Sequence, residues 1–160
     1  MKLATLCYIE KDNQYLMLHR VKKEGDMHKG LWVGLGGKFE AGESPDECVI
    51  REVFEESGLS IISPQLKGML TFPGGFDGED WYVFLFTVSR FLGVLKECTE
   101  GNLAWIDKDK LGELPMHEGD KLFTQWMQEN KGIFSVKFEY DACDASKLRD
   151  YHISHYSGGV

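Results

Sequence analysis

The sequence predicts one mixed α/β domain, in which a sheet of several strands is flanked by two helices. Segments rich in aromatic and β-branched residues recur along the chain and are separated by turn-forming residues, which is typical of strands. Two other segments carry apolar residues at helical spacing. The chain has 160 residues and contains no repeat or low-complexity linker. We therefore expect a single domain over residues 1–160.

The expected strands begin with a hairpin, in which residues 3–9 and 15–21 flank a polar turn. A polar loop at 22–30 follows and leads into a short apolar strand at 31–35. Beyond the first helix, further strands are expected at residues 66–72, 81–90, 103–106, 133–140 and 148–156. The segment WYVFLFTVSR at 81–90 is the richest in strand-forming residues, which places it at the centre of the sheet.

The first helix has well-marked ends. Ser44 is a suitable N-cap, Pro45 fits the first helical position, and Glu47 completes a Ser-x-x-Glu capping box. Gly58 can end the helix in the left-handed conformation. Four apolar residues at i,i+4 spacing are expected to pack on the core: Val49, Ile50, Val53 and Phe54. A second amphipathic helix is expected at residues 120–130.

Three carboxylates crowd one turn of the first helix. Glu52 precedes Glu55 by three residues and Glu56 by four, and like charges at these spacings oppose helix formation. Arg51 can offset only part of this repulsion. A hard divalent cation such as Mg²⁺ would resolve it, and the preceding glycines would let a main-chain carbonyl join the metal shell. The alternative is a solvated acidic helix face, and the three residues alone leave both interpretations open.

The spacing of this segment carries a specific resemblance. Gly37, five residues, Glu43, seven residues and then REVFEESGL at 51–59 match every fixed position of the Nudix box, G-x5-E-x7-R-E-U-x-E-E-x-G-U, where U is aliphatic. The chain thus resembles the MutT-type Nudix hydrolases. This resemblance implies the Nudix fold, an α/β/α sandwich in which a curved mixed sheet is flanked by helices.

The resemblance also implies a metal site. Mg²⁺, with Mn²⁺ as a possible substitute, would be held by Glu52, Glu55, Glu56 and the carbonyl of Gly37. Glu100, five residues before Trp105, is favoured over Glu97 as a further ligand. Arg51 would hold a carboxylate in place with its bidentate fork. Glu52 is the first candidate for the general base, with Glu56 and Glu100 as alternatives. Glu43 would contact the metal or support the loop.

The resemblance extends to enzymes that hydrolyse oxidised purine nucleoside triphosphates. It implies that Asp120 reads the purine edge, and N-capping of the second helix explains an aspartate there equally well. A stacking slot could be lined by Trp32, Phe72, Met116 and also Met27, all of which could instead be core residues. Lys22 or Lys23 could contact phosphate or base, or simply be solvated. His28 is expected at the surface.

The predicted function is Mg²⁺-dependent hydrolysis of a nucleoside triphosphate such as 8-oxo-dGTP to monophosphate and pyrophosphate, a reaction of nucleotide-pool sanitation and DNA repair. Val33 departs from the pattern, because mammalian enzymes of this type carry an asparagine there that bonds the base. A Nudix hydrolase for ordinary triphosphates, a dinucleoside polyphosphate or a nucleotide sugar is therefore the alternative. A non-catalytic nucleotide-binding regulatory module is the alternative of another class.

The net charge and the cysteine content indicate which binding partners and which cell compartment to expect. The net charge of −8 argues against binding a nucleic-acid polymer or a membrane surface, so a small nucleotide is the expected partner of a monomer or weak dimer. The four cysteines are far apart and lack zinc-site spacing, which predicts buried thiols. The N-terminal apolar run is too short for a signal peptide, and we expect a cytoplasmic protein.

Overall fold

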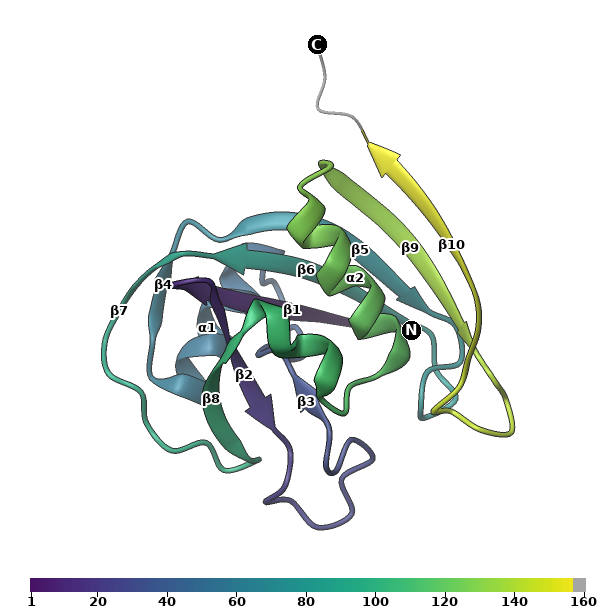
Figure 1. Ribbon diagram of the computed structural model, residues 1–160, viewed down its shortest axis with the longest axis horizontal. Coiled ribbons are helices and arrows are strands. Elements are labelled where there is room, and N and C mark those ends of the chain that lie inside the picture. Colours follow the sequence, from purple (N-terminus) through teal and green to yellow (C-terminus); the bar gives the residue numbers. More distant parts are fainter. Residues whose placement is uncertain (157–160) are drawn as a thin grey trace.

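The structure, a computed structural model, describes residues 1–156, and its centre is an eight-stranded sheet (Figure 1). The strand order is β10-β9-β5-β6-β1-β2-β3, and β8 also pairs with β2. The strands are β1 (Lys2–Lys11), β2 (Gln14–His19), β3 (Trp32–Val33), β5 (Gln65–Phe72), β6 (Trp81–Val88), β8 (Asn102–Asp107), β9 (Ile133–Tyr140) and β10 (Leu148–Tyr156). The expected domain ends at 160, so its last four residues lie outside the described part.

The sheet is mixed, as predicted. The β1–β6 and β5–β9 pairs are parallel, whereas the other pairs are antiparallel. β6 lies between β5 and β1, which confirms the central place expected for this strand. It ends at Val88 rather than at residue 90. Arg90 instead begins β7 (Arg90–Leu92), which pairs with β4 (Ser60–Ile62) in a separate two-stranded ribbon.

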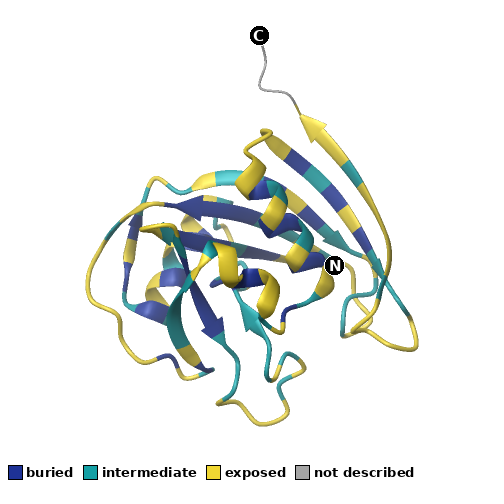
Figure 2. Ribbon diagram, viewed as in Figure 1, coloured by how far each residue is buried: buried dark blue, intermediate teal, exposed yellow. Residues whose placement is uncertain are grey.

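The two helices, α1 (Pro45–Ser57) and α2 (Glu118–Glu129), cover opposite faces of the sheet. Successive side chains of a strand point to opposite faces. Tyr8 of β1 belongs to the core cluster that contains Phe123 of α2, whereas its neighbours Cys7 and Ile9 belong to the cluster that contains Val49 of α1. Figure 2 shows this buried band along the central strands. The α/β/α arrangement is thereby confirmed, with a short 3-10 helix, η1 (Lys108–Glu113), before α2.

The ends of α1 follow from its sequence. The Ser44 side chain accepts a hydrogen bond from the Glu47 N–H, and the Glu47 side chain accepts one from the Ser44 N–H. Gly58, at φ +80°, donates its N–H to the Phe54 carbonyl. This left-handed C-cap position favours glycine. The start and the end of the helix were therefore predictable from local sequence alone.

The apolar stripe of α1 is narrower than expected. Val49 and Val53 are fully buried, but Ile50 and Phe54 are 39% and 52% exposed. Each residue turns the helix by about 100°, so Ile50 and Phe54 lie beside the stripe rather than on it. No helix within residues 1–156 combines the length and hydropathy needed to cross a membrane.

Candidate active site

Two carboxylates of α1 lie against the glycine loop, and a third carboxylate, from the segment before β8, lies near one of them. The Gly36 N–H donates to Glu56 Oε1 over 2.7 Å. A Cβ at Gly37 would lie 2.5 Å from the carboxyl carbon of Glu52, so only glycine allows this approach. Glu100 is close enough for its charge to act on Glu56. Glu52 and Glu56 thus lie against the glycine loop and Glu100 lies near Glu56, while within residues 1–156 the ligand atoms of these three side chains do not all lie within 4.8 Å of one another.

The electrostatics of this cluster suit a cation. The pKa of Glu56 is raised to about 8, chiefly by burial and also by repulsion from Glu100 and Glu52, while the hydrogen bond from the Gly36 N–H opposes the shift. A divalent cation between these groups would counter both the desolvation and the repulsion. Carboxylate oxygens are also the ligands that Mg²⁺ prefers. The donor set therefore fits Mg²⁺.

Arg51 ties the acidic residues together. Its Nε and Nη2 donate to the two oxygens of Glu43 over 2.7 and 2.9 Å, and its Nη1 donates to Glu52 over 2.9 Å and to Glu55 over 3.2 Å. The Arg51 guanidinium lowers the pKa of Glu43 to about 2. Glu43 therefore supports Arg51 and the loop in this structure. The Glu55 side chain is 56% exposed, in contrast to 18% for Glu52.

The Gly37 carbonyl, which is expected as a metal ligand, accepts hydrogen bonds in this structure. It accepts a hydrogen bond from the Thr5 N–H over 2.8 Å, and the Thr5 hydroxyl and the Cys48 thiol approach it at 3.4 and 3.6 Å. A carbonyl oxygen has two lone pairs, so these donors compete with any metal. No hydrogen bond found within residues 1–156 ends on the neighbouring Gly36 carbonyl. The Gly36 carbonyl is therefore a second candidate for a main-chain ligand, besides that of Gly37.

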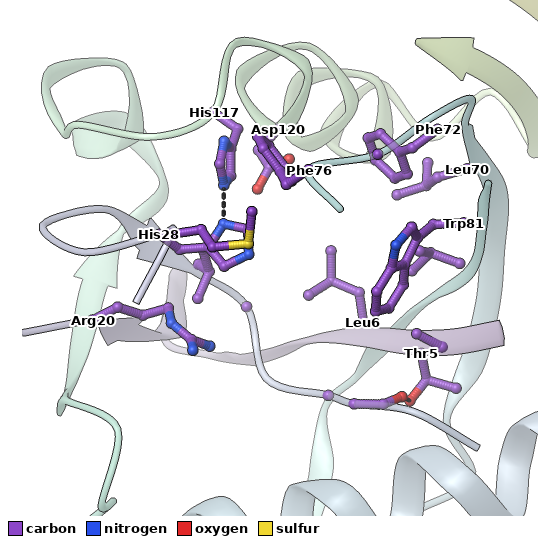
Figure 3. Close-up of a pocket in the computed structure, with 18 of the residues that line it drawn as sticks. Thr5, Leu6, Arg20, His28, Leu70, Phe72, Phe76, Trp81, His117 and Asp120 are labelled. Atoms are coloured by element: carbon purple, nitrogen blue, oxygen red, sulfur yellow. Dashed lines mark hydrogen bonds between the residues drawn. The ribbon is translucent and has the colours of Figure 1, made fainter. Parts of the chain in front are cut away.

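A cavity of about 260 Å³ opens beside the carboxylates (Figure 3). This is close to the lower limit of about 300 Å³ for small-molecule pockets. Its apolar lining includes Leu6, Met27, Val33, Leu70, Phe72, Phe76 and Trp81. Its polar lining includes Arg20, His28, His117 and Asp120, and Gly36, Gly37 and Glu56 line its wall as well. A planar aromatic ligand in the cavity would thus lie next to the candidate metal site.

Asp120 lines this cavity and is only 6% exposed. It is the third residue of α2, whose N-cap is His117, and no side-chain capping bond is made there. The capping explanation for Asp120 is therefore wrong. Burial raises the pKa of Asp120 to about 7, so both its acid and its carboxylate form are accessible near neutral pH.

Two expected slot residues lie elsewhere. Trp32 stacks on His19 with ring centroids 4.4 Å apart, whereas its neighbour Val33 lines the cavity. Adjacent strand residues face opposite ways, so the slot contact falls one residue later than predicted. Met116 is 6% exposed and belongs to the core cluster that contains α2. Phe72 and Met27 line the cavity as expected.

The two lysines expected at the substrate also lie outside the cavity lining. Lys22 donates from Nζ to the Cys98 carbonyl over 3.1 Å, and Lys23 is exposed. The cation that does line the cavity is Arg20, whose Nε donates to Asp26 over 2.6 Å and whose Nη1 donates to Glu100 over 3.3 Å. Arg20 immediately follows β2, and nothing in the local pattern distinguishes it from a surface arginine.

Sequence reasoning also missed His28, Phe76, Trp81 and His117. His28 was expected at the surface, yet it is half-buried, and its Nδ1 lies 2.9 Å from Nε2 of His117. These residues come from different loops and from the start of β6, so the chain brings them together only through its tertiary fold. An aromatic residue inside a Gly-rich loop, as at Phe76, was the only available signal.

Comparisons with known proteins agree with this geometry. The NUDIX domain family model matches residues 2–127. The uncharacterized Nudix hydrolase YvcI of Bacillus subtilis is 36% identical over 141 residues, which cover 86% of this chain and 85% of that protein. An oxidized purine nucleoside triphosphate hydrolase of Danio rerio is 31% identical over 139 residues, covering 86% and 87%.

A solved structure gives the same result for the fold. The crystal structure of a mutator MutT protein from Bacillus halodurans superposes with a TM-score of 0.83 and 32% identity, and the match covers 96% of this chain and 97% of that one. Nudix hydrolases act on phosphoric anhydride bonds of nucleotide-like substrates and generally use divalent metals such as Mg²⁺. With the box on α1, the sandwich fold and the family match together, this chain belongs to the Nudix hydrolases.

Proposed function

We propose that the protein is a Mg²⁺-dependent nucleoside triphosphate pyrophosphohydrolase that prefers oxidised purines such as 8-oxo-dGTP. The observation that carries the proposal is the position of Asp120, a buried acid in an aromatic-lined cavity whose wall includes Glu56. A purine in the cavity could stack on Phe72 or Trp81 while Asp120 bonds its polar edge. Its triphosphate would then extend towards the carboxylates. The relative from Danio rerio supports this substrate class.

The chemistry follows from the residues around the loop. Glu52, Glu56 and Glu100 would hold Mg²⁺, and Mn²⁺ could replace it. A cation held by these residues would neutralise phosphate oxygens and would lower the pKa of a nearby water. A carboxylate accepts the proton of the attacking water as the new P–O bond forms and the anhydride P–O bond breaks. Glu52 remains the first candidate for this base, with Glu56 and Glu100 as alternatives.

Arg51 acts on this reaction through position rather than contact with substrate. Its guanidinium bonds Glu52 and Glu43 at the same time, which fixes the Glu52 carboxylate beside Gly37. A bidentate arginine fork restricts orientation more than a lysine would. Arg51 is therefore a positioning residue for the metal site.

Val33 weakens the discrimination between bases. Its side chain lines the cavity and offers neither a donor nor an acceptor. An enzyme rejects a wrong base mainly by leaving buried polar groups unpaired, so an apolar wall contributes little selectivity.

The test is a substrate panel with identified products. 8-oxo-dGTP, dGTP, a dinucleoside polyphosphate and ADP-ribose are each incubated with the protein and Mg²⁺. We expect pyrophosphate and monophosphate from 8-oxo-dGTP, with kcat/KM at least about tenfold above that for dGTP. A ratio near one would contradict the oxidised-purine preference. Turnover of only the other two compounds would favour the alternative Nudix substrates, and binding without product release would favour a regulatory module.

A further inference from the structure

Tyr140 lines the cavity and has no part in the proposed function so far. It is the last residue of β9, and its ring centroid lies 6.2 Å from that of Phe76, which also lines the cavity. Its hydroxyl lies at the first turn of α2, where the oxygen accepts a hydrogen bond from the Gly119 N–H over 2.8 Å. Tyr140 therefore reaches from the end of β9 to the residue that precedes Asp120.

The approach of this hydroxyl to α2 depends on glycine. A Cβ at Gly119 would lie 2.8 Å from the Tyr140 oxygen and 3.2 Å from two ring atoms of Phe138. Real Cβ atoms essentially never show contacts below 3.0 Å, so a larger residue would displace the hydroxyl. Gly119 thus allows Tyr140 to keep its hydroxyl at the start of α2.

The hydroxyl keeps its proton at neutral pH. The pKa of Tyr140 is raised, chiefly by burial and also by the nearby charges of Asp120 and Glu118. The hydrogen bond from the Gly119 N–H opposes this shift. A hydroxyl that accepts a hydrogen bond also becomes a stronger donor, because linked hydrogen bonds polarise one another. Tyr140 therefore offers a hydrogen-bond donor at any pH near neutrality.

The donor is not used within the described part of the chain. Among residues 1–156, the hydroxyl hydrogen of Tyr140 has no acceptor, and the carboxyl of Asp120 has no hydrogen-bond partner. Asp120 is 6% exposed, and polar groups buried to that extent normally have a partner. Figure 3 shows Asp120 at the α2 end of the cavity. A polar ligand at this end would supply partners for both groups.

We propose that the Tyr140 hydroxyl determines specificity by donating a hydrogen bond to a carbonyl oxygen of the purine, in addition to the contact that Asp120 makes. Guanine offers O6 as the acceptor and an 8-oxopurine offers O8, whereas adenine has neither. Val33, on the cavity wall, has no donor for such a bond. This inference rests on the proposed triphosphate hydrolysis and deepens its specificity.

The test separates recognition of the base from support of α2. Tyr140→Phe removes the hydroxyl and keeps the ring next to Phe76. Tyr151→Phe is the matched control, because Tyr151 is 40% exposed on β10 and lies outside the cavity lining. For the wild type and both variants, kcat and KM are measured with four triphosphates: 8-oxo-dGTP has O6 and O8, dGTP only O6, 8-oxo-dATP only O8, and dATP neither. Urea unfolding measures any stability lost through the unpaired Gly119 N–H.

We expect Tyr140→Phe to lower kcat/KM for 8-oxo-dGTP by about three- to tenfold, mainly through KM, because one neutral hydrogen bond is lost. A similar loss with dGTP assigns the bond to O6, and a similar loss with 8-oxo-dATP assigns it to O8. Turnover of dATP by this variant, and of every substrate by Tyr151→Phe, should change by less than about twofold.

An equal loss with all four substrates would mean that Tyr140 only supports α2, and it would overturn the inference alone. The absence of a loss with any substrate would overturn it as well. If the wild-type protein hydrolyses none of the four, the proposed function fails, and the inference fails with it.

Discussion

Replacing Asp120 with asparagine should change how stability depends on pH. Asp120 is buried, and its pKa is raised from 3.8 to about 7 by desolvation. A carboxyl group whose pKa is higher in the folded state stabilises the fold fully below the unfolded pKa. That stabilisation is lost as pH rises through the folded pKa. Asparagine has nearly the same shape and does not titrate.

The magnitude follows from the pKa difference. A shift of about three units corresponds to about 4 kcal/mol, at about 1.4 kcal/mol per unit. The wild-type protein should therefore lose stability relative to Asp120→Asn by about 1.5 kcal/mol at pH 5 and about 4 kcal/mol at pH 8. All other titrating groups are shared by the two proteins, so their contributions cancel to first order. In a domain of this size the difference at pH 8 corresponds to about 8–16 °C in Tm.

The assay is urea unfolding of both proteins at pH 5 and pH 8. Asp109→Asn is the matched control, because it makes the same substitution at an exposed position. A stability difference between wild type and Asp120→Asn that stays constant across this range would refute the account of Asp120. If the stability of the wild type relative to Asp120→Asn were larger at pH 8 than at pH 5, the sign of the predicted pH dependence would be wrong.

Three further predictions concern the loop and α1. Glu56→Gln should lower kcat for 8-oxo-dGTP by about 100-fold or more at saturating Mg²⁺. Glu55→Gln, at an exposed position, should lower kcat by less. Wild-type turnover by Glu56→Gln would contradict the metal site. Arg51→Lys should lower kcat by about tenfold in the same assay, since lysine cannot reproduce the fork, and an unchanged kcat would argue against a positioning role. Gly36→Ala should destabilise by about 3 kcal/mol or more in urea because its Cβ would clash with a β1 carbonyl, whereas Gly42→Ala has open space and should cost about 1 kcal/mol; equal losses would contradict the close approach.

Local signals predicted the parts of the fold that local interactions determine. The capping box at Ser44 and the left-handed Gly58 specify α1 without any tertiary contact, and both were confirmed. The β4–β7 ribbon was missed because each strand has three residues and its partner lies far along the chain. The same limit explains the break after Val88, where the chain leaves the main sheet for this ribbon.

The candidate site likewise contains some residues whose proximity local sequence predicts and others that only the tertiary fold brings together. Glu52 and Glu56 share a helix, where a spacing of four residues fixes a common face, so the sequence could predict their proximity. His28 and His117 come from separate loops, and only the packed structure brings them together. In the short strand β3, neighbouring residues face opposite sides, so a shift of one position decides whether Trp32 or Val33 faces the cavity. The amino-acid composition of the strand does not indicate which of these two residues faces the cavity.

The most direct test of the central claim is a titration of Mn²⁺ into the wild-type protein and into Glu56→Gln, with free Mn²⁺ followed by electron paramagnetic resonance. A second acidic group provides the control, because ligand atoms of Glu139, Asp150 and His152 lie within 4.8 Å of one another on the exposed surface. We predict that Glu56→Gln weakens Mn²⁺ binding by at least about tenfold, while Glu139→Gln leaves it unchanged. Unchanged binding by Glu56→Gln, with loss in Glu139→Gln, would contradict a metal site at the α1 carboxylates.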